Sequence, residues 1–346
     1  MVAALLLGAG LLLWAKWAPY SAKLGGLTSS HHWAGQSTLG AAGIKAGTAP
    51  SFDAAWSFTV AYGLSVWKAL LSALLIAAAL QSLVPRGLLV GLLSRRRSVT
   101  SAATGGLASM PSMMCTCCTA PVAVSLRRCG APTSAVLAYW MGNPLLNPAV
   151  LAFLALVAPW QWVATRAVVG ALLVVFGSTA IARFSRRTTE PGMDTRDVSA
   201  QAGQPMPDDD FSLRRAPLNF GKALARLALF LVPEYFVVVL LIGAFGGWLF
   251  PISNGSANHS LVLAASLILG TLLVIPTAGE IPLAQGLSAA GFGLGVVGAL
   301  LITLPAVSLP SLVMVGRALT WRVTIAAAVG VAIAGAAAAL LLTAIS

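Results

Sequence analysis

The chain has 346 residues, of which 58% are hydrophobic and 9% are charged, and it carries a formal net charge of +12. Apolar runs of about 18 residues or more recur along it, the length that crosses the hydrocarbon core of a bilayer. This composition excludes a soluble globular domain and indicates a polytopic membrane protein. Because Lys and Arg cluster at the ends of apolar runs, we assign them to membrane topology and lipid headgroups, and we expect a lipid bilayer and no nucleic acid as partner.

Residues 1–54 are predicted to form a short transmembrane helix at about 2–19 and an external loop rich in Gly, Ser and Thr. No Lys or Arg precedes the apolar run, so the charged region that begins a secretory signal peptide is missing. We therefore expect a membrane helix here, with its N-terminus in the cytoplasm.

The first transmembrane repeat is predicted over 55–184, and its segment 98–128 is unusual. Clusters of Arg flank this segment on both sides, which places both of its ends in the cytoplasm. Its interior contains Gly105, Gly106 and Pro111, residue types that interrupt helices. We expect a hairpin that enters the membrane and returns, because irregular backbone at that depth is tolerated only inside protein or beside a wet cavity.

A polar stretch at 185–222 is predicted to be a flexible cytoplasmic linker. The second transmembrane repeat is predicted over 223–346, with segment 260–291 as the counterpart of 98–128. Full spans are predicted at about 2–19, 55–85, 133–157, 161–183, 223–250, 293–315 and 323–344. Hydropathy leaves open whether each hairpin adds further spans.

The two predicted repeats are related by a constant offset of 161 positions. The offset aligns Thr116 with Thr277, Pro121 with Pro282, Leu126 with Leu287, Gly130 with Gly291 and Pro144 with Pro305. Positive charge is gained or lost at equivalent turns, as two units of opposite orientation require.

These patterns predict an all-α polytopic membrane protein: an inverted-topology repeat of transmembrane helices with two re-entrant, broken helical hairpins. Helix breaks are predicted at Pro121, Gly130, Pro144, Pro148, Pro282, Gly291, Pro305 and Pro310. Breaks of this kind in both halves of a repeat point to the substrate site of a transporter.

The tip of the first hairpin carries Cys115, Thr116, Cys117 and Cys118. Thiolates are soft ligands, and two or three of them within four positions could meet one soft atom. Small cysteines can also serve helix packing alone, and both interpretations stay open. We assign no metal site, because a structural zinc site takes four ligands. The three histidines are distant in sequence from the cysteines.

Two acidic residues are predicted at membrane depth. Glu280 lies at the tip of the second hairpin, opposite Thr119, and could carry a proton or cap the helix that follows. Glu234, within the span 223–250, is the second candidate for proton coupling. Arg166, near the outer end of its span, has no predicted role.

Polar side chains also accompany the predicted helix breaks of the third element in each repeat. Asn143 and Asn147 precede Pro144 and Pro148, and Ser308 precedes Leu309-Pro310. Freed backbone carbonyls and amide side chains could line a central cavity and bind a substrate, or bond to neighbouring helices instead.

Motifs of other protein classes are missing from the sequence. It contains no GxxxxGK[ST] phosphate-binding loop and no HExxH motif. No plausible Ser/His/Asp set is present either. We therefore expect neither an enzyme nor a bound cofactor.

At these motifs the chain resembles the YraQ/ArsP-type predicted permease family. The family's first motif matches Cys115-Thr116-Cys117, Pro121 and 126–130, and its second matches Glu280-Ile281-Pro282 and 308–311. The resemblance covers about 55–344 and implies an inner-membrane permease, one branch of which exports trivalent organoarsenicals. The chain departs from the family pattern in Met113-Met114 before the first Cys and in two added cysteines, Cys118 and Cys129.

The resulting hypothesis is a proton-coupled secondary transporter of the bacterial inner membrane that exports a small soft-atom substrate such as a trivalent organoarsenical. The alternative is a membrane scaffold that handles thiols or metals and passes them to a partner without transport. A homo-oligomer is an open option, since the sequence does not determine oligomeric state.

Overall fold

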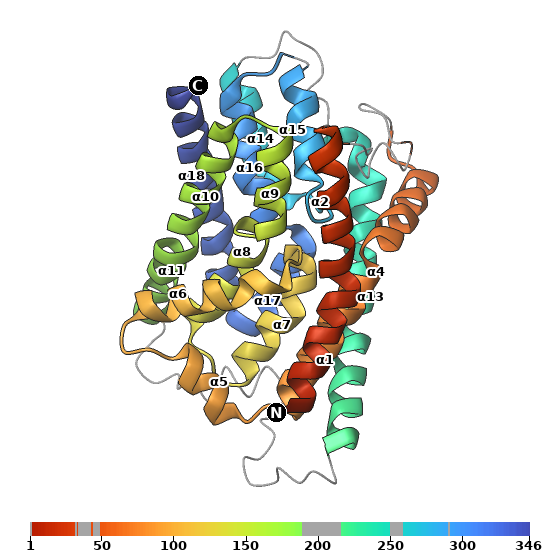
Figure 1. Cartoon of the computed structure of the whole chain (residues 1–346), viewed down its shortest axis with the longest axis vertical. Coiled ribbons are helices and arrows are strands. Elements are labelled where there is room, and N and C mark those ends of the chain that lie inside the picture. Colours follow the sequence, from red (N-terminus) through yellow and green to blue (C-terminus); the bar gives the residue numbers. More distant parts are fainter. Residues whose placement is uncertain are drawn as a thin grey trace.

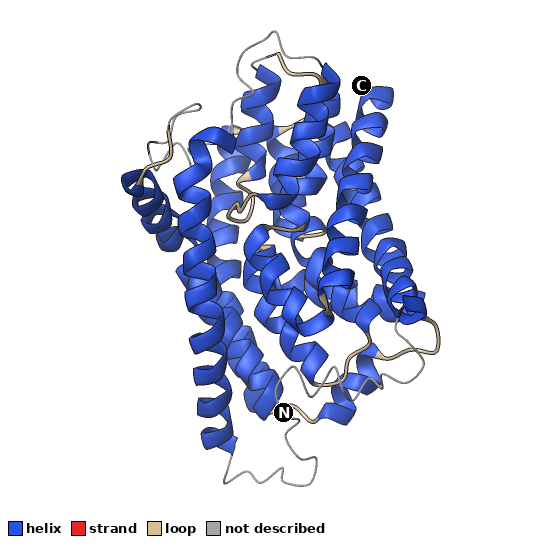
Figure 2. Ribbon diagram, turned by 180° about the vertical axis from the view of Figure 1, so that it is seen from behind, coloured by secondary structure: helices blue, strands red, loops and turns tan. Residues whose placement is uncertain are grey.

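The computed structural model describes residues 2–31, 33, 43, 49–188, 216–249, 259–289 and 291–346. Helices make up nearly all of this described part, and it contains no strand (Figure 2). The protein is an all-α polytopic membrane protein, as predicted.

The helices of the first half follow the predicted order with one addition. They are α1 (Val2–Leu12), the π-helical turn η1 (Leu13–Trp17), α2 (Ala18–Ser30), α4 (Phe52–Ser82), α5 (Arg86–Leu93), α6 (Ser98–Ser109), the 3₁₀ turn η2 (Met110–Ser112), α7 (Thr116–Arg128), α8 (Thr133–Leu145), α9 (Pro148–Val157), α10 (Trp160–Leu172), the π-helical turn η3 (Leu173–Gly177) and α11 (Ser178–Thr188). The addition is α5, between the first long helix and the hairpin.

The second half repeats this series in a shorter form. Its helices are α13 (Ala216–Leu249), α14 (His259–Leu272), α15 (Glu280–Ala289), α16 (Leu294–Ala306), α17 (Leu309–Leu319) and α18 (Trp321–Ile345). Adding 161 to the bounds of α8 reproduces those of α16, and adding 161 to the starts of α6, α9 and α10 reproduces those of α14, α17 and α18. The sequence offset is therefore also an offset of helix boundaries.

Five described helical segments are long and apolar enough to cross a membrane: 52–82, 133–157, 160–185, 217–245 and 321–345. The pair α16 and α17, bent by 50° at its break, makes a sixth if it counts as one span. Six of the seven predicted spans thus have a counterpart. The predicted first span is helical but is not among these candidates.

Equivalent contacts join the two halves. The two long helices α4 and α13 pack together. In each half of the chain, the first helix of the hairpin packs on the first segment of the broken helix, so α6 packs on α8 and α14 packs on α16. Across the halves, α7 packs against α17. In Figure 1, α6, α7 and α17 lie in the lower part with the N-terminus, whereas α9, α14 and α15 lie in the upper part with the C-terminus.

Glycines end the inner helices of both hairpins. Gly130 and Gly291 have φ values of +93° and +84°, in the left-handed region that favours glycine after a helix. The N–H of the following residue in each half, Ala131 or Phe292, bonds back to the carbonyl of Leu126 or Leu287. In the structure, a helix ends shortly before each of these two glycines.

One of the predicted proline breaks is wrong, because helix α7 continues through Pro121. Pro282 lies in the first turn of α15, shortly after the non-helical stretch 273–279, where a missing N–H leaves no helical bond unmade. The other four prolines also lie at breaks. Pro144 and Pro305 lie in the last turns of α8 and α16, and Pro148 and Pro310 lie in the first turns of α9 and α17.

Gly105 and Gly106 do not interrupt the first hairpin either, since both lie inside α6. A Cβ built on Gly105 would lie 2.8 Å from the Cα of Ala135 in α8. Gly105 is therefore needed for close helix packing, and the break comes later, at η2 with Pro111.

The predicted boundaries at the N-terminus and at the linker also need correction. The first helical segment continues through η1 and α2 to Ser30, into the predicted loop. Helices α11 and α13 both extend into the predicted linker 185–222, up to Thr188 and from Ala216. The rest of that linker, the predicted outer turn at 251–258 and most of 32–48 lie outside the described residues.

Candidate functional site between the hairpin tips

The two broken helices restart with polar caps at equivalent positions. Asn147 Oδ1 accepts hydrogen bonds from the N–H groups of Ala149 and Val150 at the start of α9. Ser308 forms a capping box with Ser311 at the start of α17. Both caps are buried, so Asn147 and Ser308 first serve to restart a helix inside the protein. Asn147 Nδ2 remains without a hydrogen-bond partner in the described part of the chain.

Asn143 fixes the tip of the first hairpin. Its Oδ1 accepts a 2.7 Å hydrogen bond from the backbone N–H of Met114, and its Nδ2 donates to Ser112 Oγ. Between these contacts the chain turns through Met113, which has a φ of +48°. The fully buried amide therefore holds the irregular backbone that precedes α7.

Thr116 links this tip to the broken helix of the other half. Its hydroxyl lies 3.3 Å from the hydroxyl of Ser308, and both residues are buried. The inner helix of the second hairpin also contacts the opposite half, where Gln285 Nε2 in α15 donates a 2.6 Å bond to the carbonyl of Val157 at the end of α9. Each hairpin thus contacts the broken helix of the opposite half.

Three thiols gather at the N-terminus of α7. Cys115 Sγ lies 3.0 Å from Cys117 Sγ and 3.2 Å from Cys118 Sγ, and all three are buried. The hydroxyls of Tyr62 in α4 and Tyr235 in α13 lie 3.3 Å and 3.7 Å from Cys117 Sγ. The structure therefore places the predicted thiols in one cluster, and the two equivalent long helices enclose it.

Lys16 approaches the same cluster from the N-terminal segment. It lies in the π-helical turn η1, is 7% exposed, and donates hydrogen bonds of 3.1 Å to Tyr20 Oη and 3.2 Å to Thr277 Oγ1. Its ammonium interacts electrostatically with Cys115 and Cys118. Sequence analysis missed this residue, although a Lys inside an apolar run is a signal of a buried partner.

Glu280 forms a buried ion pair with Arg166. Arg166 Nη1 lies 2.7 Å from Glu280 Oε1, and the two residues are 0% and 3% exposed. Arg166 Nε and Nη2 donate to the carbonyls of Leu145 and Pro144, which the helix break leaves without helical partners. Arg166 thus ties the broken end of α8 to the first residue of α15. It is the partner that the sequence could not assign.

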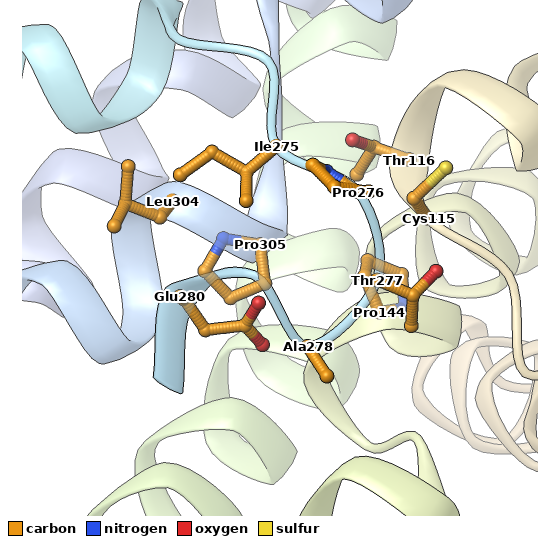
Figure 3. A pocket seen from close by; sticks show the side chains of 10 residues that line it. All are labelled: Cys115, Thr116, Pro144, Ile275, Pro276, Thr277, Ala278, Glu280, Leu304 and Pro305. Carbon is orange, nitrogen blue, oxygen red and sulfur yellow. The ribbon is translucent and has the colours of Figure 1, made fainter. Parts of the chain in front are cut away.

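A small cavity lies where both hairpin tips and both helix breaks meet (Figure 3). Its lining comes from both hairpin tips and from the prolines and neighbours at both breaks: Cys115, Thr116, Pro144, Ile275, Pro276, Thr277, Ala278, Glu280, Leu304 and Pro305. Its volume of about 10 Å³ holds about one water molecule. The cavity is therefore small in this conformation, and any larger substrate requires the hairpins to separate.

The second acidic candidate lies elsewhere. Glu234 Oε1 in α13 is 3.3 Å from Arg317 Nη2, in the last turn of α17, and Glu234 is not among the cavity-lining residues. The structure therefore brings together eight of the nine predicted site residues around the hairpin tips and helix breaks, and leaves Glu234 apart from them.

Comparison with known proteins agrees with this architecture. Residues 51–344 match the ArsP_1 family, described as predicted permeases. The chain belongs to this permease family. It is 37% identical over 310 residues to the UPF0718 protein YraQ of Escherichia coli (strain K12), an alignment that covers 89% of this chain and 84% of that protein. No solved structure matches the chain.

Membership makes the protein a multi-pass membrane permease, a class associated with transport rather than catalysis. The matched region contains both hairpins, both broken helices and the ion pair, but not Lys16. The N-terminal helical segment of this permease therefore adds a charged residue to a site that otherwise lies within the family region.

Proposed function

We propose that this permease is a secondary transporter that exports a small soft-atom substrate, such as a trivalent organoarsenical, across the bacterial inner membrane. The observation that carries the proposal is the shared cavity, which has Cys115 of one hairpin and Glu280 of the other in its lining. Thiols are ligands for soft atoms, and paired helix breaks at the centre of a repeat are where transporters bind their substrates.

The small cavity is compatible with alternating access. With room for about one water molecule, the site cannot hold a larger substrate in this conformation. In an inverted repeat, the hairpin with α7 would enter from one side of the membrane and the hairpin with α15 from the other. This agrees with the positions of α7 and α15 in Figure 1. Rocking of one half against the other would then expose the cavity on each side in turn.

The ion pair offers a route for proton coupling. Protonation of Glu280 would remove its negative charge, while Arg166 would keep its bonds to the carbonyls of Pro144 and Leu145. The second hairpin would then be released from α10, and the cavity could open. Deprotonation would restore the pair and close it again.

Transport in inside-out membrane vesicles tests this proposal. The vesicles are energised by respiration and supplied with methylarsenite, and accumulated arsenic is measured by mass spectrometry. Vesicles with the wild-type protein should accumulate arsenic, and a protonophore should remove part of this accumulation. Vesicles with the Glu280→Gln variant should lack this protonophore-sensitive part. Glu234→Gln is the matched control, an acid outside the cavity lining, and should retain accumulation. Loss in Glu234→Gln with retention in Glu280→Gln would contradict the coupling route.

The scaffold function is a second candidate, because two of the three clustered thiols, Cys117 and Cys118, are outside the cavity lining. A scaffold would bind a soft atom and pass it to a partner protein. Its function should depend on the cysteines and tolerate Glu280→Gln, and wild-type vesicles should show no accumulation. The same vesicle experiment therefore separates the two candidates.

A further inference from the structure

The thiol cluster has the arrangement of a three-sulfur binding site. The Sγ atoms of Cys115, Cys117 and Cys118 all lie within 4.8 Å of one another. Cys115 is the N-cap of the 13-residue helix α7, and the other two lie in its first turn, so a short stretch of backbone fixes all three sulfurs. No His, Asp or Glu side chain of the described residues joins the group.

Lys16 brings a buried positive charge to the cluster, which favours the thiolate form of these cysteines. A buried ammonium is costly unless an anionic group compensates it. Among the described residues no carboxylate pairs with Lys16. Its hydrogen-bond acceptors are two neutral hydroxyls, those of Tyr20 and Thr277, and the groups with which it interacts electrostatically include Cys115 and Cys118. The N-terminal end of α7 also favours negative charge on these sulfurs.

The number of sulfurs selects the ligand. A structural zinc ion takes four protein ligands, and the described cluster provides three. A methylated trivalent arsenical has two exchangeable groups and needs only two thiols, whereas arsenite or antimonite has three. Cys118 is the added thiol of this chain relative to the Cys-Thr-Cys motif. The third sulfur therefore favours a centre that forms three bonds to sulfur.

We propose that Cys115, Cys117 and Cys118 form a three-thiol site for an inorganic trivalent soft centre of the arsenite or antimonite class, with Lys16 as the cation beside it. The proposal names a substrate class for the transport site and rests on the proposed function in that respect. Its binding chemistry can be tested without transport.

The binding step is a ligand exchange without oxidation or reduction. As(OH)₃ reacts with three Cys thiols, three As–O bonds break, three As–S bonds form, and the three thiol protons leave with the hydroxides as three water molecules. Arsenic stays trivalent throughout. Phenylarsine oxide reacts with only two thiols, forms two As–S bonds and releases one water, so it is the matched two-bond probe.

The first experiment measures binding by the full-length protein in lipid nanodiscs, from the ultraviolet absorption of As–S bonds. Wild-type protein should bind both arsenite and phenylarsine oxide. Cys118→Ser should weaken arsenite binding by about tenfold or more and leave the affinity for phenylarsine oxide within about twofold. Retained binding of the two-bond probe also shows that the variant is folded. Cys129→Ser, which removes the cysteine outside the cluster, should change neither affinity.

The second experiment tests the cation with a pair of lysine variants. Lys16→Met should slow arsenite binding by about tenfold, because the cation favours the thiolate that attacks the arsenic. Lys68→Met is the control, because Lys68 in α4 lies over the rings of Trp14 and Trp67 and contributes no contact to the thiols among those described. It should bind arsenite as wild type does. Equal rates of arsenite binding in wild type and Lys16→Met would overturn the assignment of Lys16.

Failure of the site and failure of the transport function give different results. A wild-type protein that binds phenylarsine oxide but not arsenite, or a Cys118→Ser variant that loses both ligands equally or neither, would overturn the three-thiol site. Arsenite binding in nanodiscs without arsenic accumulation in vesicles would overturn the transport function and support the site. Methylarsenite accumulation without arsenite binding would support the transport function and overturn the three-thiol site.

Discussion

Arg166 and Glu280 are separated by 114 positions and meet in an interior where neither charge could remain alone. The guanidinium makes three contacts at once, with one carboxylate oxygen and two backbone carbonyls, so it balances a charge and completes a broken helix end. Sequence analysis found Glu280 because an acid in an apolar segment is conspicuous. Its partner could not be assigned, since only folding brings α10 to the tip of the second hairpin.

Removing Arg166 should destabilise the protein more than removing the pair. Arg166→Met leaves a buried carboxylate and two carbonyls unpaired, and we expect it to lower the free energy of unfolding by about 3–5 kcal/mol. Adding Glu280→Gln to that variant should recover part of the loss, because the unpaired charge is gone. Thermal unfolding in detergent, compared across the two single variants and the double variant, measures this. Additive effects would show that the two side chains do not interact.

At the scale of single elements, the first hairpin is defined by one close helix contact and one irregular turn. Gly105 lets α6 approach the backbone of α8, and Asn143 of α8 holds the turn that follows α6. Both contacts use the same helix, so α8 positions the whole hairpin and, through it, the thiols at the start of α7. The glycines were correctly recognised as special, but their role is close packing and not a helix break.

A methyl group at Gly105 should separate α6 from α8. The added Cβ would lie 2.8 Å from the Cα of Ala135, closer than real Cβ contacts. We expect Gly105→Ala to destabilise the protein by about 1–3 kcal/mol, as overpacking does. The measurement is the temperature at which half of the detergent-solubilised protein remains monodisperse.

Gly63→Ala in α4 is the matched control, since a Cβ there meets nothing within 4 Å. Because alanine favours helix more than glycine does, this change should be neutral or stabilising by up to about 1 kcal/mol. Equal melting temperatures for the two variants would contradict the close contact at Gly105.

At the scale of the whole molecule, the site exists because two halves of similar helix order meet. The hairpin of one half reaches the broken helix of the other, as Thr116 does with Ser308 and Gln285 with the carbonyl of Val157. The cavity lies at this junction and is lined by residues from both halves. The halves differ in chemistry, since one tip contains thiols and the other contains the acid.

The proposed inverted repeat makes a prediction about membrane topology. Seven crossings and two re-entrant hairpins place the N-terminus in the cytoplasm and the C-terminus outside it, which agrees with their positions at opposite ends of the molecule in Figure 1. Alkaline phosphatase fused after Ser346 should therefore be active, and green fluorescent protein fused before Met1 should fluoresce. Phosphatase fused after Thr188, at the end of α11, is the control and should be inactive. An inactive C-terminal fusion would require an even number of crossings.

The sequence by itself determined the helical membrane fold, the 161-residue repeat and the positions of the polar groups at the hairpin tips and helix breaks. These follow from hydropathy, from the placement of Gly and Pro, and from charges at the ends of apolar runs, all of which are local properties of the chain. Only the tertiary structure decided which side chains meet. Lys16, Tyr62 and Tyr235 converge on the thiols, and Arg166 on Glu280, because long-range helix packing sets those distances and no local pattern encodes them.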